Sequence, residues 1–297
     1  MNQLKTINNY LIFHNGTIES QVCNDDIIFE KNNVTVKQAV SLQIFYLIDQ
    51  EGEYQFDLNI NGELELIEIY DIKTDAVLNK KISIYENSKL LRYVDNQSID
   101  NIKTKISEDV AVAKNADIRC AYVELSNSNV DLDINYSLNE PEAKATVRLA
   151  SLAKKDEQKH VTIAISHDAC YTTGIMDNYG VVKDAASLVI DGIGTIHKGN
   201  HQSNSHQTNK IIVFDEKCNA KANPYLYIDE YDVKASHGAS VGKIDENHLY
   251  YLQSRGLSRQ EAMHLVTYGY FIPVLEFIDN DELKDIFSQT LMEKVGL

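Results

Sequence analysis

Alternation of apolar and polar residues with a period of two constrains the fold of this chain more than any other feature. Residues 62–72 (GELELIEIYDI) and residues 129–138 (NVDLDINYSL) are clear cases. Successive side chains of a β-strand point to opposite faces, so this period is typical of half-buried strands. Similar short segments, separated by Asn, Asp and Gly, continue to about residue 230: KATVRLASLA, HVTIAIS, ASLVIDGIGTIHKG and NKIIVF. The pattern predicts a mainly β region and leaves a sandwich, a barrel and a β-solenoid as alternatives.

The period becomes helical after residue 243. Asp245 is placed to cap a first short helix, and Ser258 with Glu261 has the spacing of a capping box at the start of a second. Pro273 should end or kink that second helix, because proline lacks the amide that the helix interior needs. A third helix is expected to begin near residues 279–280 and to carry an apolar stripe of Leu283, Ile286, Phe287 and Leu291.

Charge and length exclude several classes of protein. The chain has 297 residues, of which 43% are hydrophobic, and a formal net charge of −16. Such an acidic chain is not expected to bind a nucleic-acid backbone or an anionic membrane as its main partner. No apolar run approaches the length of a membrane span, and residues 1–16 lack the apolar core of a signal peptide. We therefore expect a cytoplasmic protein.

Familiar catalytic motifs are absent from the sequence, including the P-loop, GxSxG, HExxH and GxGxxG. Gly192, Gly194 and Gly199 lack the spacing of a dinucleotide-binding loop, and we expect them to form turns. His201 and His206 are expected in a solvated polar loop, because two histidines need further ligands to hold a metal. By motif alone, the chain is not a self-sufficient enzyme.

The cysteines are scattered rather than paired. None of the four lies in a CxxC motif or at a zinc-site spacing, so free thiols are expected. The default role for each is that of a small buried hydrophobic residue. The four are Cys23, Cys120, Cys170 and Cys218.

Residues 232–245 (DVKASHGASVGKID) place a single histidine, His237, among very small side chains. One interpretation is a tight turn with an incidental histidine. The other is an imidazole that a group outside this chain reaches.

Residues 232–270 (DVKASHGASVGKIDENHLYYLQSRGLSRQEAMHLVTYGY) resemble the C-terminal signature of the SufB/SufD family, the scaffolds of the SUF iron–sulfur cluster assembly machinery. Ser236 and Gly238 flank His237 as in SufD, whereas SufB has an E-H-E-A setting. Upstream, YGVVKDAASLVIDGIGTIHKGN and QTNKIIVFDEKCNAKANPYLYI are also similar to family patterns. The resemblance extends over about residues 130–270.

The resemblance implies a right-handed parallel β-helix with a short C-terminal helical subdomain. Residues 1–243 would form the scaffold core, and residues 244–297 would dock SufC, an ABC-type ATPase. The ATPase activity would then reside in the partner, and this chain would not itself be an enzyme. A sulfur donor and a second scaffold chain are the other implied partners. The residues predicted to contribute to ATPase docking are Tyr250, Tyr251, Arg255 and Tyr268.

The resemblance also implies that His237 and Cys218 bind a transient iron–sulfur cluster, expected as [4Fe-4S]. His237 matches a SufD histidine at the scaffold interface, and Cys218 falls where SufB has its interface cysteine. Imidazole and thiolate both bind iron, and we expect Lys217 or Lys221 to lower the pKa of the Cys218 thiol. Many SufD proteins have a cysteine where this chain has Ala235, which removes one thiol from the site.

Nineteen positions separate Cys218 from His237, and a β-helix turn of about that length would place them on neighbouring coils. The presence of both ligand types in one chain slightly favours a homodimer over a SufB–SufD heterodimer. An alternative function is an interaction module that recruits or regulates the ATPase without binding a cluster. A β-helix carbohydrate-active enzyme is a weaker alternative, because no carboxylate pair stands out.

Overall fold

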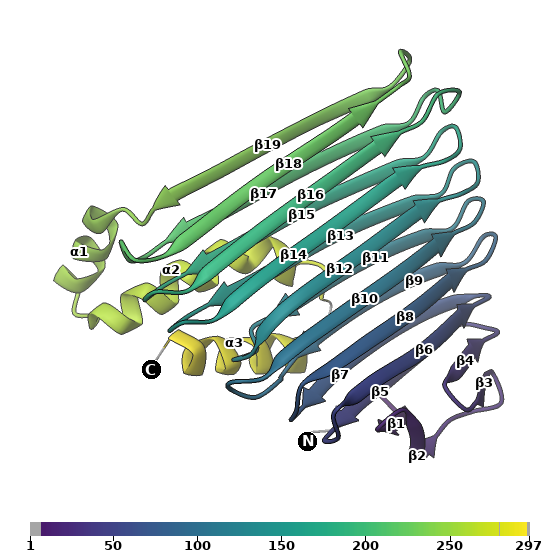
Figure 1. The fold of residues 1–297 in the computed structure, drawn as a ribbon, viewed down its shortest axis with the longest axis horizontal. Helices are drawn as coiled ribbons and strands as arrows, with labels where there is room; N and C mark the ends of the chain where they lie inside the picture. Colours follow the sequence, from purple (N-terminus) through teal and green to yellow (C-terminus); the bar gives the residue numbers. More distant parts are fainter. Residues whose placement is uncertain (1–6, 279, 296–297) are drawn as a thin grey trace.

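The chain folds into a long parallel β-solenoid followed by three helices, as the computed structural model describes for residues 7–278 and 280–295 (Figure 1). The strands are β1 (Asn9–His14), β2 (Thr17–Val22), β3 (Ile27–Glu30), β4 (Asn33–Val36), β5 (Val40–Ile48), β6 (Gly52–Ile60), β7 (Glu63–Ile72), β8 (Ala76–Ile84), β9 (Lys89–Asn96), β10 (Lys103–Val112), β11 (Asp117–Glu124), β12 (Asn129–Leu138), β13 (Lys144–Ala153), β14 (Gln158–His167), β15 (Thr173–Val182), β16 (Ser187–Ile196), β17 (Asn204–Val213), β18 (Asn219–Ile228) and β19 (Lys234–Lys243). The helices are α1 (Glu246–Ser254), α2 (Arg259–Leu275) and α3 (Asp281–Val295). The prediction of a parallel β-helix with a helical C-terminal part is confirmed.

Two sheets form the walls of the solenoid. In the described part of the chain, the ten-stranded sheet contains β1, β2 and the odd-numbered strands from β5 to β19, and the nine-stranded sheet contains β3 and the even-numbered strands from β4 to β18. From β6 onward, each strand pairs in parallel with the strand two places before it, so one coil consists of two strands and two turns. Paired residues of successive coils lie between 24 and 33 positions apart. The expected coil of about nineteen residues is therefore too short.

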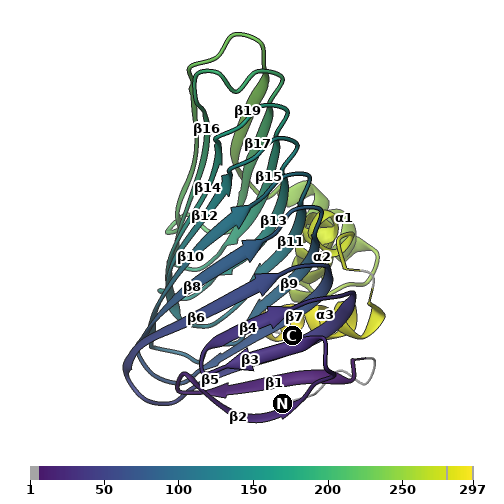
Figure 2. The same cartoon turned by 90° about the vertical axis from the view of Figure 1, so that its right-hand side faces the viewer.

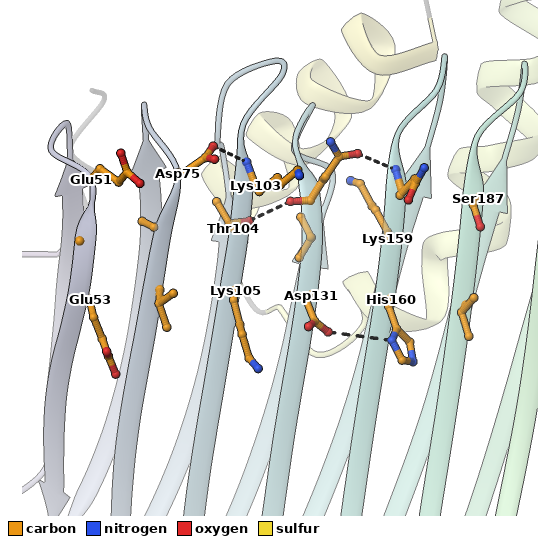
Figure 3. A pocket seen from close by; sticks show the side chains of 17 residues that line it. Glu51, Glu53, Asp75, Lys103, Thr104, Lys105, Asp131, Lys159, His160 and Ser187 are labelled. Atoms are coloured by element: carbon orange, nitrogen blue, oxygen red, sulfur yellow. Dashed lines mark hydrogen bonds and ion pairs between the residues drawn. The ribbon is translucent and has the colours of Figure 1, made fainter.

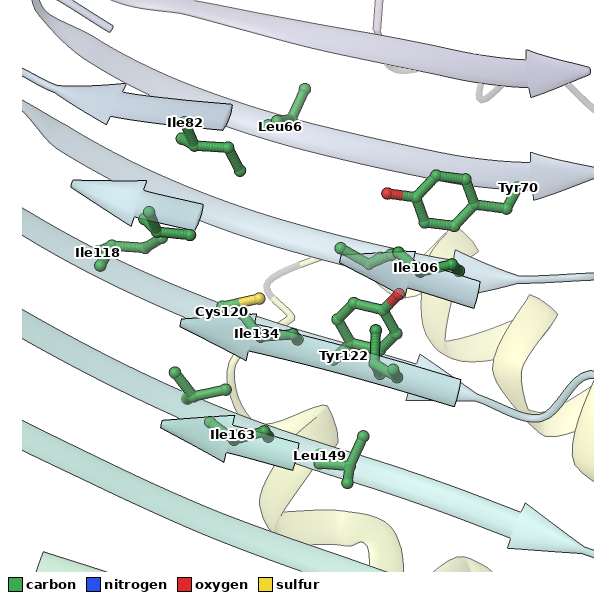
Figure 4. Packing of buried hydrophobic residues seen from close by; sticks show 14 of the residues in the cluster. Leu66, Tyr70, Ile82, Ile106, Ile118, Cys120, Tyr122, Ile134, Leu149 and Ile163 are labelled. Carbon is green, nitrogen blue, oxygen red and sulfur yellow. The ribbon is translucent and has the colours of Figure 1, made fainter. Parts of the chain in front are cut away.

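The two-residue alternation separates the inside of the solenoid from its outside. In β12, for example, every second residue from Val130 to Leu138 is buried. Figure 4 shows side chains such as Ile118, Ile134 and Ile163 filling the space between the two sheets. Stacked coils repeat this arrangement, so the same inward positions form continuous apolar rows.

A group of four charged side chains interrupts this apolar interior in the middle of the solenoid. Arg92 donates to Glu68 from Nε and to Glu108 from Nη1, each at 2.5 Å. The Lys80 ammonium donates to Glu68 Oε1 at 2.6 Å. All four side chains are at most 2% exposed. Charges this deeply buried are tolerated because each faces an opposite charge.

The helices cover the outer face of the ten-stranded sheet (Figure 2). Phe271 of α2 and Phe287 of α3 pack in one buried cluster with Ala121, Ala150 and Val181, which point outward from the sheet. These strands are therefore apolar on both faces where the helices lie. The outer face of the nine-stranded sheet carries no described helix (Figure 2).

Helix ends follow the sequence signals with one exception. The Asp245 side chain accepts from Asn247 N, and Ser258 and Glu261 form the predicted capping box. Pro273 was predicted to end or kink α2, and the helix does not end there, because it continues to Leu275. A proline this near the end removes a single intrahelical amide, and the helix still completes its last turn.

The two ends of the solenoid differ. At the N-terminal end, β1–β2 and β3–β4 form antiparallel pairs, whose edge strands β2 and β3 have six and four residues. At the other end, β18 and β19 have ten residues each and are the last described strands of their sheets. Every residue of β19 is exposed. Long unpaired edges such as these are templates for pairing with another chain.

Candidate functional site

His237 lies on β19 with its side chain on the inward row of the solenoid. The strand register pairs His237 with Gln207 of β17, which is fully buried between the two sheets. Ala235 and Ala239 share the inward row, whereas Ser236 and Gly238 face outward by alternation. His237 is nevertheless exposed, because no further described coil covers it. The histidine is therefore on an open strand edge and not in a turn.

Cys218 lies at the other end of the same coil, one residue before β18. Its thiol is half-buried and is 3.7 Å from the Asp184 carbonyl oxygen. Burial raises the pKa of this thiol, and the Asp215 and Asp184 carboxylates add to the increase. The expectation that neighbouring lysines lower this pKa is wrong, because burial has the largest effect on the thiol and raises its pKa.

Within one chain, Cys218 and His237 are far apart. Gln207 Nε2 donates to the Tyr225 carbonyl at 2.6 Å, which places His237 in the layer of Tyr225. Tyr225 follows Cys218 by seven strand positions, or about 23 Å at roughly 3.3 Å per residue. The two residues lie in opposite sheets of the last coil, so the prediction of neighbouring coils is wrong. Among the described residues, no group of three or more His, Cys, Asp or Glu could hold a metal ion.

The glycines upstream have a different role from the one expected. Gly199 is in a turn with φ of +91°. The prediction of turns is wrong for Gly192 and Gly194, since both lie in the middle of β16 and face inward. A Cβ atom on Gly192 would be 2.7 Å from Gln207 Oε1, and one on Gly194 would be 2.8 Å from Ser205 Oγ. These two glycines leave room for polar side chains from the opposite sheet.

The polar segment that follows, residues 201–210, was expected to be a loop but lies partly in a strand. His201 is in a turn, but His206 lies on β17, where it pairs with Ser236 of β19. The His206 Nδ1 atom is 2.6 Å from Ser236 Oγ. All five residues of SHQTN are polar, so the sequence carried no two-residue alternation that would have indicated this strand.

Three side-chain amides point inward in the two coils below His237, and the sequence analysis did not identify them. Gln207 and Asn209 donate to the Tyr225 and Asn223 carbonyls of β18, at 2.6 and 3.1 Å. Asn178 of the preceding coil donates to Asn209 Oδ1 at 2.8 Å. The amides thus connect the ten-stranded sheet to the nine-stranded sheet at the open end.

The predicted ATPase-docking residues divide into two groups. Tyr250 and Tyr251 of α1 are 75% and 56% exposed, and the Arg255 guanidinium lies 5.2 Å from the centre of the Tyr251 ring. Tyr268 is partly buried, with its ring centre 6.3 Å from that of Phe287. Tyr268 therefore packs α2 against α3, while the other three residues form an exposed surface on and beside α1.

A groove of about 890 Å³ crosses the outer face of the nine-stranded sheet (Figure 3). Side chains of both charge signs line it, among them Lys105 and Asp131 on neighbouring strands. His160 Nε2 is 2.8 Å from Asp191 Oδ2, and its Nδ1 is 3.9 Å from Asp131 Oδ1. The histidine is thus held between two carboxylates on a solvated surface, and no nucleophile lies with it in these contacts.

Known proteins match most of this chain. The family profile described as "SUF system FeS cluster assembly, SufBD core domain" matches residues 55–270. "Iron-sulfur cluster assembly protein SufD" of Bacillus subtilis is 25% identical over 318 residues, which cover 95% of this chain and 71% of that protein.

Two further relatives match over shorter segments. SufD of Escherichia coli is 27% identical over 154 residues, which cover 51% of this chain and 36% of that protein. An iron–sulfur cluster assembly SufBD family protein of Mycobacterium tuberculosis is 31% identical over 132 residues, covering 44% of this chain and 16% of the relative. None of the helices described here has the length and apolar character needed to cross a membrane.

Proposed function

This chain belongs to the SufBD family of SUF-system iron–sulfur cluster assembly proteins, and on this basis we propose that it is a scaffold subunit that builds clusters at an interface with a second scaffold chain. A SufC-like ABC ATPase would drive the cycle, a sulfur donor would supply sulfide, and the cluster would be passed on to recipient proteins. The observation that carries the proposal is the open last coil, where His237 stands on the inward row of a fully exposed ten-residue edge strand.

The open edge favours a closed dimer. An exposed edge of ten residues is stabilised when a second strand satisfies its free backbone groups. The opposite end of the solenoid has only short antiparallel edge strands, so it offers no equivalent surface. Pairing of like ends gives a two-fold dimer, whereas pairing of unlike ends would give a filament.

A two-fold axis would also bring the two predicted ligands closer together. The midpoint of β19 lies between Gly238 and Ala239. If two β19 strands pair antiparallel about this point, Cys218 of the partner subunit falls about four positions, or roughly 13 Å, from His237 along the strand direction. Within one chain the offset is seven positions. Association thus supports a shared site better than either chain alone.

The chemistry of the two residues suits a transient cargo. Thiolate and imidazole are both established ligands of iron in clusters. The raised pKa of Cys218 keeps the thiol protonated in the absence of metal, so iron must displace a proton to bind. A site with few protein ligands holds a cluster less firmly than a set of four thiolates.

The ATPase would dock on the exposed surface of α1. β19 ends at Lys243 and α1 begins at Glu246, so the proposed docking surface follows the interface strand almost directly. Movement of α1 on ATP binding would therefore act on the strand that carries His237.

One observation favours the alternative function. The separation of Cys218 from His237 leaves a single chain without a complete metal site in its described residues. A protein of this kind that recruits or regulates the ATPase without holding a cluster would need only the helical surface.

Anaerobic reconstitution with iron and sulfide separates the two functions. We expect the wild-type protein to develop visible charge-transfer absorbance and to retain iron, and His237→Ala with Cys218→Ala to retain less than half as much iron per chain. Cys170→Ala and His201→Ala serve as matched controls, since both lie in turns at a distance from Cys218. Undiminished iron in the double variant, or a wild-type protein that stays colourless, would contradict the scaffold function.

A further inference from the structure

The interior of the solenoid changes character immediately below His237. The inward row that carries His237 continues through Gln207, Met176 and Val147, one residue per coil. The last two are apolar and fully buried, as in an ordinary solenoid core. Gln207 is equally buried but presents a carboxamide.

The carboxamide of Gln207 spans the gap between the two sheets. Its Nε2 atom donates to the Tyr225 carbonyl of β18 at 2.6 Å. Its Oε1 atom is buried and has no hydrogen-bond partner among the described residues. On that side stands Gly192, where any Cβ atom would approach Oε1 to 2.7 Å.

Stability alone does not account for this arrangement. A buried acceptor without a partner costs free energy, and an apolar side chain of the same shape would avoid that cost. The last coil also has few other means of holding its sheets apart. Four of its ten inward residues are alanines, namely Ala220, Ala222, Ala235 and Ala239.

We propose that Gln207 is a positioning residue for His237. Its bond to Tyr225 fixes the width of the open end in the layer of the imidazole, and Gly192 provides the space that the carboxamide requires. His237 lies directly over Gln207 in register, at the strand spacing of about 4.8 Å. The inference rests on the proposed function, in which His237 binds the cluster.

Four variants test the bridge, by which we mean the hydrogen bond from Gln207 to the Tyr225 carbonyl. Gln207→Met keeps the length of the side chain and removes both hydrogen-bonding atoms. Gly192→Ala leaves Gln207 in place but displaces its carboxamide. Gly192→Ala is then repeated in a Gln207→Ala background, where the closest contact is gone and the added methyl group meets only the Asn209 carboxamide, at 3.0 Å. Gly269→Ala is the matched control, because a Cβ atom there meets nothing within 4 Å.

Two measurements report on each variant: amide hydrogen exchange of β18 and β19, and iron per chain after anaerobic reconstitution. We expect Gln207→Met and Gly192→Ala to accelerate exchange in both strands at least about tenfold and to lower iron at least about twofold. Gly192→Ala should have a smaller effect in the Gln207→Ala background, where only the Asn209 contact remains, and Gly269→Ala should match the wild type. Should Gln207→Met fail to fold, Gly192→Ala answers the same question.

His237→Ala, measured in parallel, separates this inference from the proposed function. If His237→Ala loses iron while both bridge variants keep it, the positioning role is wrong and the cluster site stands. If His237→Ala keeps its iron, the site assignment is wrong, and the exchange rates still decide whether Gln207 fixes the open end. Unchanged exchange in Gln207→Met and Gly192→Ala overturns the inference whatever the iron content.

Discussion

Lys294, near the end of α3, is buried against Glu157 of the solenoid, and its Nζ donates to both carboxylate oxygens at 2.7 and 2.8 Å. The same ammonium reaches the Ser126 carbonyl and Asn127 Oδ1. It is the most enclosed polar contact between the helices and the solenoid, because both side chains are at most 6% exposed. The Lys294 side chain thus anchors α3 to turns of the solenoid.

Lys294→Met should loosen α3 without unfolding the solenoid. The substitution removes the donor that the buried Glu157 carboxylate shares with the Ser126 carbonyl and Asn127 Oδ1, which costs about 1–3 kcal/mol locally. Hydrogen exchange should accelerate in α3 and leave β5 to β15 unchanged. Lys284→Met, on the exposed side of α3, is the control. Equal protection of α3 in both variants would contradict the anchoring role.

Arg92→Met should destabilise the whole solenoid. Arg92 neutralises Glu68 and Glu108, both fully buried, and its removal leaves one of these carboxylates without a cation. We expect a loss of about 3–5 kcal/mol in the free energy of unfolding, measured by urea denaturation. A variant in which all four members of the group, Arg92, Lys80, Glu68 and Glu108, become apolar should recover part of that loss. A single variant as stable as the wild type would contradict the buried network.

His167 should make the protein less stable in mild acid. Burial lowers the pKa of His167 to about 4 in the folded state, against an ordinary value of 6.5. Between these values the unfolded chain binds a proton that the folded chain excludes, so stability is fully present above pH 6.5 and falls toward pH 4. The expected loss is about 3 kcal/mol.

The contribution of His167 is isolated by comparison with His167→Gln. Buried Asp95 acts in the opposite direction, because its pKa is raised to about 6. Both proteins contain Asp95, so its contribution cancels in the difference between their free energies of unfolding, measured from pH 7.5 to 4. A difference that does not change with pH would show that His167 is not the responsible group.

Gly238→Lys should weaken dimerisation and leave the folded chain intact. A Cβ atom at Gly238 meets nothing within 4 Å, so the single chain accommodates a side chain there. In a two-fold dimer paired through β19, two lysines would lie near one another at the interface, and we expect the dissociation constant to rise at least about tenfold. Sedimentation velocity measures it, with Gly269→Lys as control. An unchanged dimer would place the interface elsewhere.

Tyr250→Ala with Tyr251→Ala should weaken binding of the SufC-like ATPase at least about tenfold, since exposed aromatic residues often carry most of the binding energy. Point variants are preferable to removal of residues 244–297, because the helices cover an apolar face of the sheet. Tyr85→Ala, at an exposed tyrosine in a solenoid turn, is the control for binding measured by calorimetry. Full-strength binding by the double variant would exclude α1 as the docking surface.

Much of the fold was predictable because it depends on local patterns. Alternation in strands such as β12 and the caps Asp245 and Ser258 are properties of neighbouring residues, and the structure confirms them. The choice of a β-helix came from the family resemblance instead. Coil length was mispredicted because it depends on the turns as well as the strands, and turn length carries no periodic signal.

The candidate site was less predictable because it depends on contacts between distant segments. Gly192 and Gln207 are 15 positions apart in sequence, and only the stacking of β16 against β17 reveals that one makes room for the other. The separation of Cys218 from His237 follows likewise from cross-sheet register, which no linear spacing encodes.

The open end has a consequence for biosynthesis. The ribosome releases β19 after every other described strand, so a nascent chain has no His237-bearing edge until its solenoid is otherwise complete. A chain stopped at β14 would instead expose the apolar inward row of Val161, Ile163 and Ile165. Such a fragment would be a substrate for chaperones and proteases. The completed edge has alanines and a single imidazole on its inward row, so it exposes less apolar surface before a partner binds.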